Sequence, residues 1–372
     1  MREDWDIRLF KDVFDLQMGK TPDRKNFSLF EGDNTWVSIK DLDGKYISSS
    51  KECISDEAAK NIKLVKRGTV IMSFKLTVGK TAIAGKDLYT NEAIMAFNLR
   101  NGYDIDASFL YYYLKNYRWE GSNKAVMGIT LNKATISKHK IAIPPKPTQL
   151  SIVTELDKLN ELIRIKKEQL KDYDTLAQSI FYEMFGDPVV NEKGWEVKQL
   201  KDVSTLLNGR AYKQHELLDK GKYKVLRVGN FFTNSIFYYS DLELDDDKYC
   251  EYGDLLFAWS ASFGAFIWNG DKVIYHYHIW KVLFDKDCLN IQYYRYLLNT
   301  MTSFFMNDVH GIGMVHLTKS GMEQYDLPIP PLSLQHSFAH KIEQIERQKA
   351  AVQRTIKDLE TLLAVRMQYW FD

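Results

Sequence analysis

The chain repeats itself at an interval of about 186 residues. Landmarks of the first half return in the same order in the second: Trp5, Gly68, Leu131, Ile143, Pro144, Pro145, Gln149, Leu156, Leu176 and Phe185 match Trp195, Gly253, Leu317, Ile329, Pro330, Pro331, Gln335, Ile342, Leu362 and Phe371. The offset stays at 186 from Leu131 to Phe185 but drifts from 190 to 185 between Trp5 and Gly68. This period excludes a solenoid, whose units run about 20 to 50 residues. It predicts a duplicated unit of one globular domain and one helical segment, with internal two-fold symmetry.

Composition and length indicate a folded protein, which the repeat divides into two globular and two helical parts. The 372 residues suffice for two or three domains, and 45% hydrophobic with 27% charged residues is typical of a folded chain. Cys53, Cys250 and Cys288 form no CxxC pair, which argues against a disulfide framework or a thiolate zinc site. The start is charged and no apolar run approaches the roughly 18 residues of a membrane span, so we expect a cytoplasmic protein.

Two long helices are predicted at 147–184 and 333–370. Each follows a Pro-Pro pair and has a cap candidate, Thr148 or Ser333. Apolar residues then recur at spacings of three and four, as in a coiled-coil seam. The seam residues are Leu156, Leu159, Ile163, Leu170, Tyr173 and Ile180 in the first helix, and Ile342, Ile345, Val352, Ile356, Leu359 and Leu363 in the second. Lys166, Lys349 and Arg366 interrupt this seam.

We expect the two helices to pair antiparallel, because a repeat that folds back on itself then closes with pseudo-two-fold symmetry. Helices of roughly 36 residues reach about 54 Å, the length of a spacer. The alternative is that each helix packs only on its own globular domain. The fold class is α+β: mixed α/β domains at 1–146 and 188–331 alternate with helical segments at 147–187 and 332–372.

The globular domains combine β-branched strand patterns with tyrosine-rich helices. Strands are predicted at 37–42, 69–74, 225–231 and 254–259. Helices are predicted at 108–114 and 293–298, and their clustered tyrosines are interpreted as core.

No sequence motif indicates a catalytic site. Gly19-Lys20-Thr21 and Gly79-Lys80-Thr81 imitate the end of a Walker A loop but lack its leading glycine. His276 and His278 have the spacing of half a metal site on one strand face. Their counterparts, Thr90 and Glu92, make a metal function shared by both repeats implausible. The sequence predicts no catalytic residue and no metal site.

Basic residues point to DNA instead. Residues 1–146 carry a net charge of +6, from 24 Lys and Arg against 18 Asp and Glu, and 115–146 holds seven basic residues against Glu120. Such a stripe binds phosphates or is simply a solvated surface. Lysines and arginines contact phosphates and, with Asn and Ser, base edges, while Trp offers stacking. The candidates are Lys20, Lys40, Lys75, Lys80, Lys124 and Lys133 in the first domain, and Arg210, Lys213, Arg227, Asn230, Trp259, Ser260 and Lys319 in the second.

Their equivalent placement is the stronger argument. Lys20 and Arg210 follow the first strand, Lys40 and Arg227 lie in the second, and Lys133 and Lys319 precede the Pro-Pro turn. This layout resembles the specificity subunit of type I restriction-modification systems: two variable globular domains alternate with two similar helical segments. Each helical segment is entered through Ile-Pro-Pro followed by Gln (Gln149 and Gln335). The resemblance covers the whole chain.

The resemblance implies a DNA reader without catalysis of its own. Each globular domain would be a target recognition domain that reads one half of a bipartite, asymmetric sequence in double-stranded DNA. The helices would set the spacing and dock two methyltransferase subunits and, in a complete complex, restriction subunits. S-adenosylmethionine, ATP and Mg²⁺ are expected only on those partners, so this chain needs no cofactor.

Two alternatives stay open at this stage. One is a protein-protein scaffold with a coiled-coil rod, which would not need the basic stripe. The other is a stand-alone nuclease, for which no matched set of carboxylates and a lysine aligns in both repeats.

Overall fold

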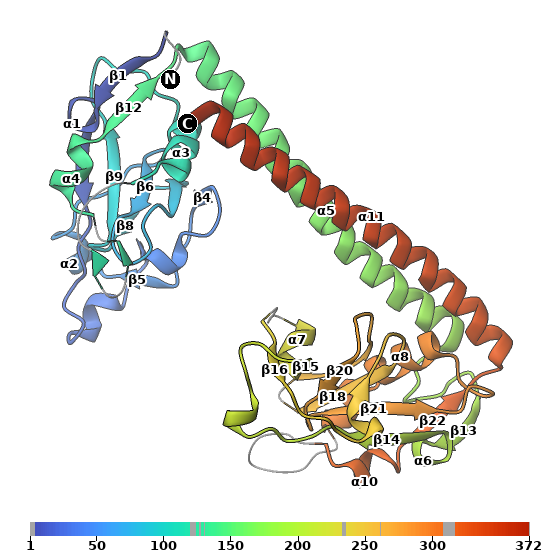
Figure 1. Ribbon diagram of the computed structural model, residues 1–372. Coiled ribbons are helices and arrows are strands. Elements are labelled where there is room, and N and C mark those ends of the chain that lie inside the picture. Colours follow the sequence, from blue (N-terminus) through green and yellow to red (C-terminus); the bar gives the residue numbers. More distant parts are fainter. Residues whose placement is uncertain are drawn as a thin grey trace. The chain divides into compact units, whose positions relative to one another are not determined.

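The computed structural model describes residues 4–119, 124–125, 128–129, 131–232, 236–260, 262–307 and 317–371. The chain forms two compact units (Figure 1). Unit 1 comprises Met1–Lys167 with Thr355–Asp372, and unit 2 comprises Glu168–Arg354. Each unit contains one globular domain, called domain 1 (up to residue 145) and domain 2 (186–331), and part of both long helices. Within the described residues, no helix combines the length and the apolar character that crossing a membrane requires.

Domain 1 is organised around a five-stranded sheet of order β2-β9-β6-β7-β4. Its strands are β2 (Phe14–Met18), β4 (Tyr46–Ile47), β6 (Val70–Ser73), β7 (Thr81–Ala84) and β9 (Ile94–Leu99). A second sheet has the order β5-β3-β8, from β3 (Asn34–Val37), β5 (Glu52–Ile54) and β8 (Tyr89–Thr90). Two pairs complete it: β1 (Asp6–Leu9) with β12 (Lys140–Ile143), and β10 (Lys124–Ala125) with β11 (Gly128–Ile129). The helices are α1 (Phe10–Val13), α2 (Asp56–Ala59), α3 (Ala107–Asn116) and α4 (Lys133–Lys138), with 3-10 turns at Phe27–Phe30 and Ile39–Asp41.

Domain 2 repeats this plan. Its main sheet, β14-β21-β18-β19, comprises β14 (Ser204–Asn208), β18 (Leu255–Ser260), β19 (Ser262–Ile267) and β21 (Ile279–Phe284). The second sheet, β16-β15-β20-β17, comprises β15 (Tyr223–Leu226), β16 (Tyr238–Ser240), β17 (Tyr249–Cys250) and β20 (Val273–Tyr275). β13 (Glu196–Gln199) pairs with β22 (Asp326–Ile329). The helices are α6 (Leu200–Val203), α7 (Val228–Phe232), α8 (Ile291–Thr300), α9 (Thr302–Asn307) and α10 (Lys319–Met322), with 3-10 turns at Gln214–Glu216 and Asp246–Lys248.

The predicted duplication is confirmed by these sheets. The order β2-β9-β6-β7 matches β14-β21-β18-β19, with every pair antiparallel. In both second sheets a strand of the first part of the domain pairs parallel with a later one, β3 with β8 and β15 with β20. The tyrosine-rich helices α3 and α8 cover the main sheets. Their predicted core role is confirmed, since Tyr112, Tyr113, Tyr293 and Tyr294 are buried.

Two strand predictions were wrong in their bounds. The strand predicted at 37–42 lies at Asn34–Val37 and shares only Val37 with the prediction, and the strand predicted at 225–231 lies at Tyr223–Leu226. In each repeat a side chain turns the backbone by accepting a hydrogen bond from the amide three residues earlier. Asp41 accepts from the Ser38 N–H (2.8 Å), and Asn230 accepts from the Arg227 N–H (2.9 Å). Such local side-chain bonds compete with strand pairing, which explains why β-branched composition misled the prediction.

The long helices are α5 (Lys146–Phe185) and α11 (Leu332–Phe371). Both start earlier than predicted, and Thr148 and Ser333 are not their caps. The first helical amides donate to the carbonyls of Pro145 and Pro331, so these prolines hold the cap positions. Pro147 is tolerated because its missing N–H would have no partner in the first turn.

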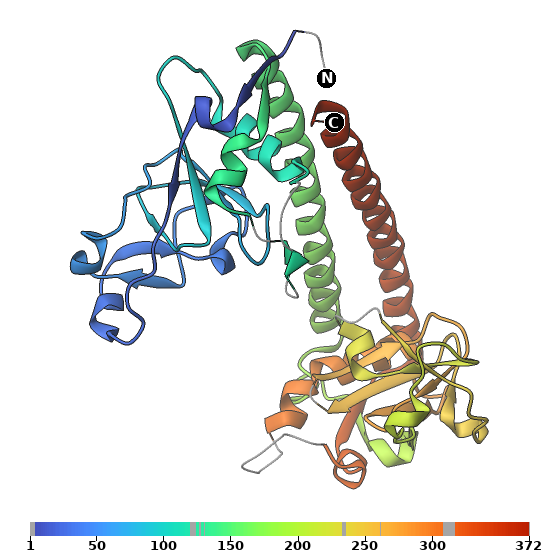
Figure 2. The same ribbon diagram turned by 60° about the vertical axis from the view of Figure 1, so that its left-hand side comes forward.

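The antiparallel pairing of the helices is visible within each unit. In unit 1, Glu155 of α5 binds Arg366 of α11, and Lys167 contacts Glu360 (2.7 Å). In unit 2, Asp174 binds Lys349 (2.7 Å). The predicted seam residues are all buried or half-buried. Of the three charged residues that interrupt the seam, Lys349 and Arg366 therefore form ion pairs between the two helices. Figures 1 and 2 show α5 in green beside α11 in red.

Candidate nucleic-acid interface

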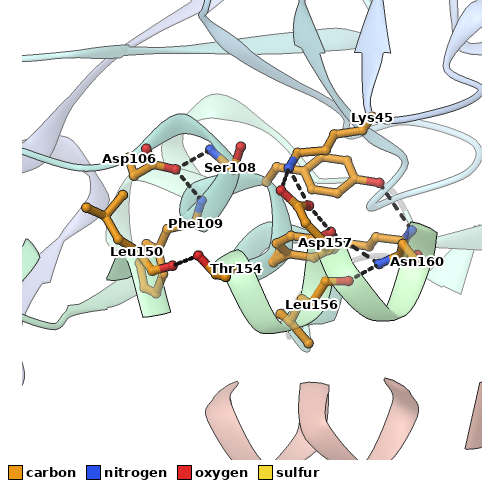
Figure 3. Close-up of polar contacts among 12 residues, drawn as sticks. Lys45, Asp106, Ser108, Phe109, Leu150, Thr154, Leu156, Asp157 and Asn160 are labelled. Atoms are coloured by element: carbon orange, nitrogen blue, oxygen red, sulfur yellow. Dashed lines mark hydrogen bonds and ion pairs between the residues drawn. The ribbon is translucent and has the colours of Figure 1, made fainter. Parts of the chain in front are cut away.

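A buried glutamine joins each long helix to its globular domain. Gln149, 1% exposed, accepts a hydrogen bond from the Asp106 N–H (2.8 Å) and donates to the carbonyls of Asp104 (3.1 Å) and Pro144 (3.0 Å). Asp106 in turn caps α3 by accepting from the amides of Ser108 and Phe109 (Figure 3). The helix start, the α3 cap and the Pro-Pro turn are thus held by one side chain.

Gln335 makes the same three bonds in domain 2. It accepts from the Asn290 N–H (2.8 Å) and donates to the carbonyls of Cys288 (2.9 Å) and Pro330 (2.8 Å). Asn290 caps α8 as Asp106 caps α3. We call each of these glutamines, with its three hydrogen bonds, a helix joint. All its bonds run from the glutamine to backbone atoms, so it does not depend on the side chains of the domain.

Domain 1 is also tied to α5 by a polar cluster. Lys45, next to β4, lies 2.6 Å and 2.8 Å from the two carboxylate oxygens of Asp157 (Figure 3). The Tyr112 hydroxyl donates to Asp157 and accepts from the Asn160 amide (3.2 Å). Burial, followed by these carboxylate contacts, raises the pKa of Tyr112 far above its ordinary value. The hydroxyl therefore stays protonated and keeps its bond to Asp157.

The C-terminal end of α11 packs back on domain 1. Phe371 lies 5.8 Å from both Phe109 and Tyr113 of α3, measured between ring centroids. Its counterpart Phe185, at the end of α5, lies 4.6 Å from Tyr293 of α8. Each domain is therefore held by the start of one long helix and the end of the other.

Within domain 1, most basic candidates gather at one end of the main sheet. Lys20 follows β2, Lys75 follows β6, Lys80 precedes β7, and Lys133 opens α4. The register places these strand ends side by side, with Met18 opposite Met95 and Ser73 opposite Ile94. Lys20, Lys40, Lys80 and Lys133 are exposed and Lys75 is half-buried. We call this end of the main sheet, and the equivalent end in domain 2, the strand-end face.

A repeated glycine sets the position of the first basic residue. A Cβ at Gly19 would lie 2.1 Å from the Thr90 carbonyl oxygen, and a Cβ at Gly209 would lie 2.4 Å from that of Tyr275. The next residues donate to the same carbonyls, Lys20 at 2.9 Å and Arg210 at 3.0 Å. The two sheets of each domain therefore meet where Lys20 and Arg210 project. The sequence signal was present as Gly-Lys and Gly-Arg, although Lys20 and Arg210 follow the second strand rather than the first.

In domain 2 most of the candidate DNA-binding residues contact other residues of the domain. Arg210 forms a two-bond ion pair with Glu216 (2.8 and 2.9 Å), which lowers the pKa of Glu216 to about 2. Arg227 is exposed over the Tyr238 ring, and Lys213 is exposed. Asn230 donates to the Ile236 carbonyl, and Ser260 is 2% exposed. Lys319 contacts Glu323 at 3.7 Å.

The basic residues of the stripe at 115–146 fall into two groups, one in contact with other residues of domain 1 and one exposed. Lys146 pairs with Asp104 beside the helix joint, and Lys115, in the last turn of α3, lies over the Tyr111 ring. Lys133 and Lys138 are exposed on α4. The side chain of Lys124 lies outside the described residues.

An aromatic hollow of about 680 Å³ lies at the strand-end face of domain 2. Its lining includes Trp259, Tyr277, His278, Trp280 and Lys319. The sequence analysis proposed Trp259 and Lys319 as DNA contacts, considered His278 only as half of a metal site, and missed Tyr277 and Trp280. The available signal was the aromatic run from Tyr275 to Trp280, where domain 1 has Thr90 to Met95.

The two histidines in this region lie in the turn between β20 and β21 rather than on a strand. Their predicted counterparts were wrong by one residue: the Thr90 carbonyl takes the place of the Tyr275 carbonyl, so His276 and His278 correspond to Asn91 and Ala93 rather than to Thr90 and Glu92. Burial, with His278 and Arg227 nearby, lowers the pKa of His276 to about 4. Among the residues that the structure describes, no three His, Cys, Asp or Glu side chains gather in a way that could hold a metal ion.

Comparisons with known proteins identify the repeat. The family model described as type I restriction modification DNA specificity domain matches twice, at residues 2–172 and 192–361. The chain is 26% identical to the specificity subunit of the type I restriction enzyme MjaIX of Methanocaldococcus jannaschii, covering 90% of this chain and 85% of that protein. It is 21% identical to the MjaVIII specificity subunit of the same organism, covering 97% and 92%.

Solved structures share the fold. A chain from a structure on complex assembly and conformational transition of the type I restriction-modification system superposes with a TM-score of 0.66 at 17% identity, covering 100% of this chain and 98% of that one. The specificity subunit from M. genitalium superposes with a TM-score of 0.51 at 13% identity, covering 99% and 96%.

Proposed function

Because the chain belongs to the family of type I restriction-modification specificity subunits, carrying the family's DNA specificity domain twice, we propose that it reads a bipartite, asymmetric DNA sequence. Each domain would read one half-site with its strand-end face. The observation that carries this proposal is the equivalent placement of basic residues in two domains whose loops otherwise differ. Lys20 matches Arg210, and Lys133 matches Lys319, at the same end of the same sheet.

The side chains at the strand-end faces suit two tasks. Exposed lysines such as Lys20 and Lys133 provide phosphate contacts, which fix the register of a protein on DNA but carry no sequence information. Arg210 is held by Glu216 in a defined orientation, as base readout requires. Trp259 adds an aromatic surface. In domain 2 a lysine, Lys319, and an aromatic side chain, Trp259, lie together at the strand-end face.

The long helices offer a surface for partner subunits. Leu362, Val365 and Tyr369 of α11 are each about half exposed, and their spacing of three and four puts them on one face. On α5, Leu176 is equally exposed, and it occupies the position of Leu362 in the repeat. An exposed apolar stripe on a helix is a typical interaction site. We propose that methyltransferase subunits, one for each repeat, dock here.

Catalysis belongs to those partners in this proposal. S-adenosylmethionine, ATP and Mg²⁺ would bind to methyltransferase and restriction subunits. The purified chain alone is therefore expected to show no methyltransferase or nuclease turnover. Activity that copurifies with this chain through several orthogonal chromatographic steps would contradict a purely reading role.

A scaffold without DNA binding is the competing function. It would explain the paired helices and their apolar stripe equally well. It would not explain why basic residues occupy the same strand ends in both domains. That repeated placement favours the reader.

The deciding experiment is to co-express the chain with its cognate methyltransferase subunit and to map methylated adenines by long-read sequencing. A motif with two specific parts separated by a fixed spacer is expected. The double variant Lys20→Ala, Lys133→Ala should reduce methylation. Lys11→Ala, an exposed lysine beyond the opposite end of β2, is the matched control. Absence of methylation from an assembled, soluble complex would favour the scaffold.

A further inference from the structure

We propose that Leu76 of domain 1 reads the C5-methyl group of a thymine in the major groove of the target. The inference rests on the proposed reading role of domain 1 and names the chemical group of the base that this residue would recognise. Leu76 lies at the strand-end face, in the loop between β6 and β7, with Lys75 and Lys80 on either side of it in the chain. The sequence analysis did not propose it as a DNA contact.

Leu76 combines an unfavourable backbone conformation with high exposure. Its φ is +61°, in the left-handed region, where the Cβ of an ordinary residue crowds the following carbonyl oxygen. Among the residues that the structure describes, the other non-glycine residue with positive φ is Asn191, and Asn tolerates this region far better than Leu. Leu76 is 65% exposed, so burial in the domain does not offset the strain. Such strain in an exposed apolar residue is typical of a binding site.

Buried Ser73 holds the loop in this conformation. Its hydroxyl donates to the Thr77 carbonyl and accepts from the Lys80 N–H (3.1 Å), and its own carbonyl accepts from the Gly79 N–H (3.0 Å). The Ser73 N–H donates to the Lys80 carbonyl (2.8 Å). Ser73 is 0% exposed, so water does not compete for these bonds. The loop is thus fixed before any ligand arrives, and presenting Leu76 on binding costs little conformational entropy.

The charges around Leu76 suit the phosphates of DNA. Residues 73–86 contain Lys75, Lys80 and Lys86 and no Asp or Glu. Lys75 is half-buried and Lys80 is exposed. Cations on either side of the loop provide the phosphate contacts that fix the register of a protein on the duplex. Leu76 is then the side chain between them that remains to contact a base.

An aliphatic side chain has one specific partner in the grooves of an intact duplex. Leu76 carries no hydrogen-bond donor or acceptor, so it cannot read the polar groups of the base edges. The apolar group of the major-groove edge is the thymine methyl, and the minor-groove edge offers none. Insertion of Leu76 between two bases from the minor groove is the alternative. It would have to unstack a base step, and a single leucine on a short loop offers little contact area to offset that cost.

Domain 2 has no leucine at this place. With the offset of 185 that relates Gly79 to Gly264, Leu76 corresponds to Ala261, whose structure lies outside the described residues. By the same offset, Lys75 and Lys80 correspond to Ser260 and Ala265. The inference therefore applies to the half-site of domain 1, and the half-site of domain 2 serves as an internal control.

The test measures the affinity of the assembled complex, with its methyltransferase subunits, for the mapped target. Each thymine of both half-sites, on either strand, is replaced in turn by uracil, which pairs in the same way but lacks the methyl group. We expect one position of the domain 1 half at which uracil weakens binding about fourfold, the effect of one buried methyl group. Uracil effects in the domain 2 half should not depend on Leu76.

Variants of Leu76 assign this loss to the loop. Leu76→Ala should bind the thymine and uracil targets equally, whereas Leu76→Met, which keeps an apolar side chain of similar volume, should retain most of the difference. Leu76→Gly should also abolish the difference without lowering the melting temperature, because glycine adopts the left-handed conformation freely. Leu99→Ala is the matched control, since Leu99 is 41% exposed and ends β9 at the opposite end of the main sheet.

The outcomes are distinguishable. A uracil effect in the domain 1 half that disappears in Leu76→Ala and remains in Leu99→Ala supports the inference. A domain 1 half without such an effect, or with one that persists in Leu76→Ala, overturns the inference and leaves the reading role intact. Equal weakening of thymine and uracil targets by Leu76→Ala also overturns it, in favour of insertion between bases. No preference for the mapped target over an unrelated duplex overturns the reading role itself.

Discussion

The helix joints and the strand-end faces have diverged to very different degrees. Gln149 and Gln335 make the same three hydrogen bonds at distances that differ by no more than 0.2 Å. At the strand-end faces, Phe74 corresponds to Trp259 and Glu92 to Tyr277. The joint is a constant part of the repeat, and the face is a variable part.

The chemistry of the joint explains how this difference is tolerated. Every bond of the glutamine ends on a backbone atom, so the domain can change its side chains without losing the joint. The constant offset of 186 residues covers the helices, whereas the offset drifts through the loops of the globular domains. The structure thus separates a fixed frame from strand-end faces whose side chains can be replaced.

The largest expected effect comes from breaking a joint. Gln335→Leu leaves the Asn290 N–H and the Cys288 and Pro330 carbonyls without their buried partner, which should cost about 3 kcal/mol of unfolding free energy. Gln149→Leu should cost a similar amount if the joints are equivalent. Urea denaturation measures both, with the exposed Gln353→Ala of α11 as control. Unequal losses of unfolding free energy in the two variants would show that the two joints are not equivalent.

The strand-end faces should respond unequally to the loss of a cation. Lys133→Ala is expected to weaken DNA binding about tenfold near 0.1 M salt and to lower the slope of log K against log salt by about 0.9. Arg210→Ala should lower the slope less, because Arg210 is already paired with Glu216. Salt titrations of DNA affinity separate the two. A larger slope change for Arg210→Ala than for Lys133→Ala would contradict this expectation and assign the stronger phosphate contact to Arg210.

A smaller effect is expected in the helix pair of unit 2. The side chain of Lys349 is 19% exposed in the seam, where it binds Asp174. Lys349→Ala should lower the unfolding free energy by about 1 kcal/mol through lost packing and the lost ion pair. Lys349→Met keeps the apolar stem and should recover most of this loss. If methionine is as damaging as alanine, the ion pair rather than packing stabilises the seam.

The last expected effect concerns pH and domain 2 alone. The pKa of His276 is lowered to about 4, below the roughly 6.5 of an unfolded chain. The folded state therefore binds this proton less readily, so its stability contribution is complete above pH 6.5 and is lost as pH falls towards 4. His276→Gln should flatten thermal stability over this window. An unchanged pH profile would mean that His276 is not the titrating group.

The frame was predictable from the sequence, and the strand-end faces were predictable only in part. Duplication and heptad spacing predicted both long helices to within one residue at each end. The glutamines were recognised as landmarks, but their role required backbone positions that no spacing reveals. Lys20 and Lys133 were found because they recur at matching places. Tyr277 and Trp280 were missed, and His278 was considered only as half of a metal site, because the turn between β20 and β21 brings them to Trp259. Such turns follow from tertiary contacts rather than from local pattern.

The most direct test of a fixed frame with replaceable reading surfaces is an exchange of domains. Residues 196–329 would be replaced by the matching part of another family member that reads a different target, and the methylation motif would be mapped again. The half of the motif that belongs to domain 2 should change, while the other half and the spacer stay the same. A change in both halves would contradict the separation of frame and reading surface.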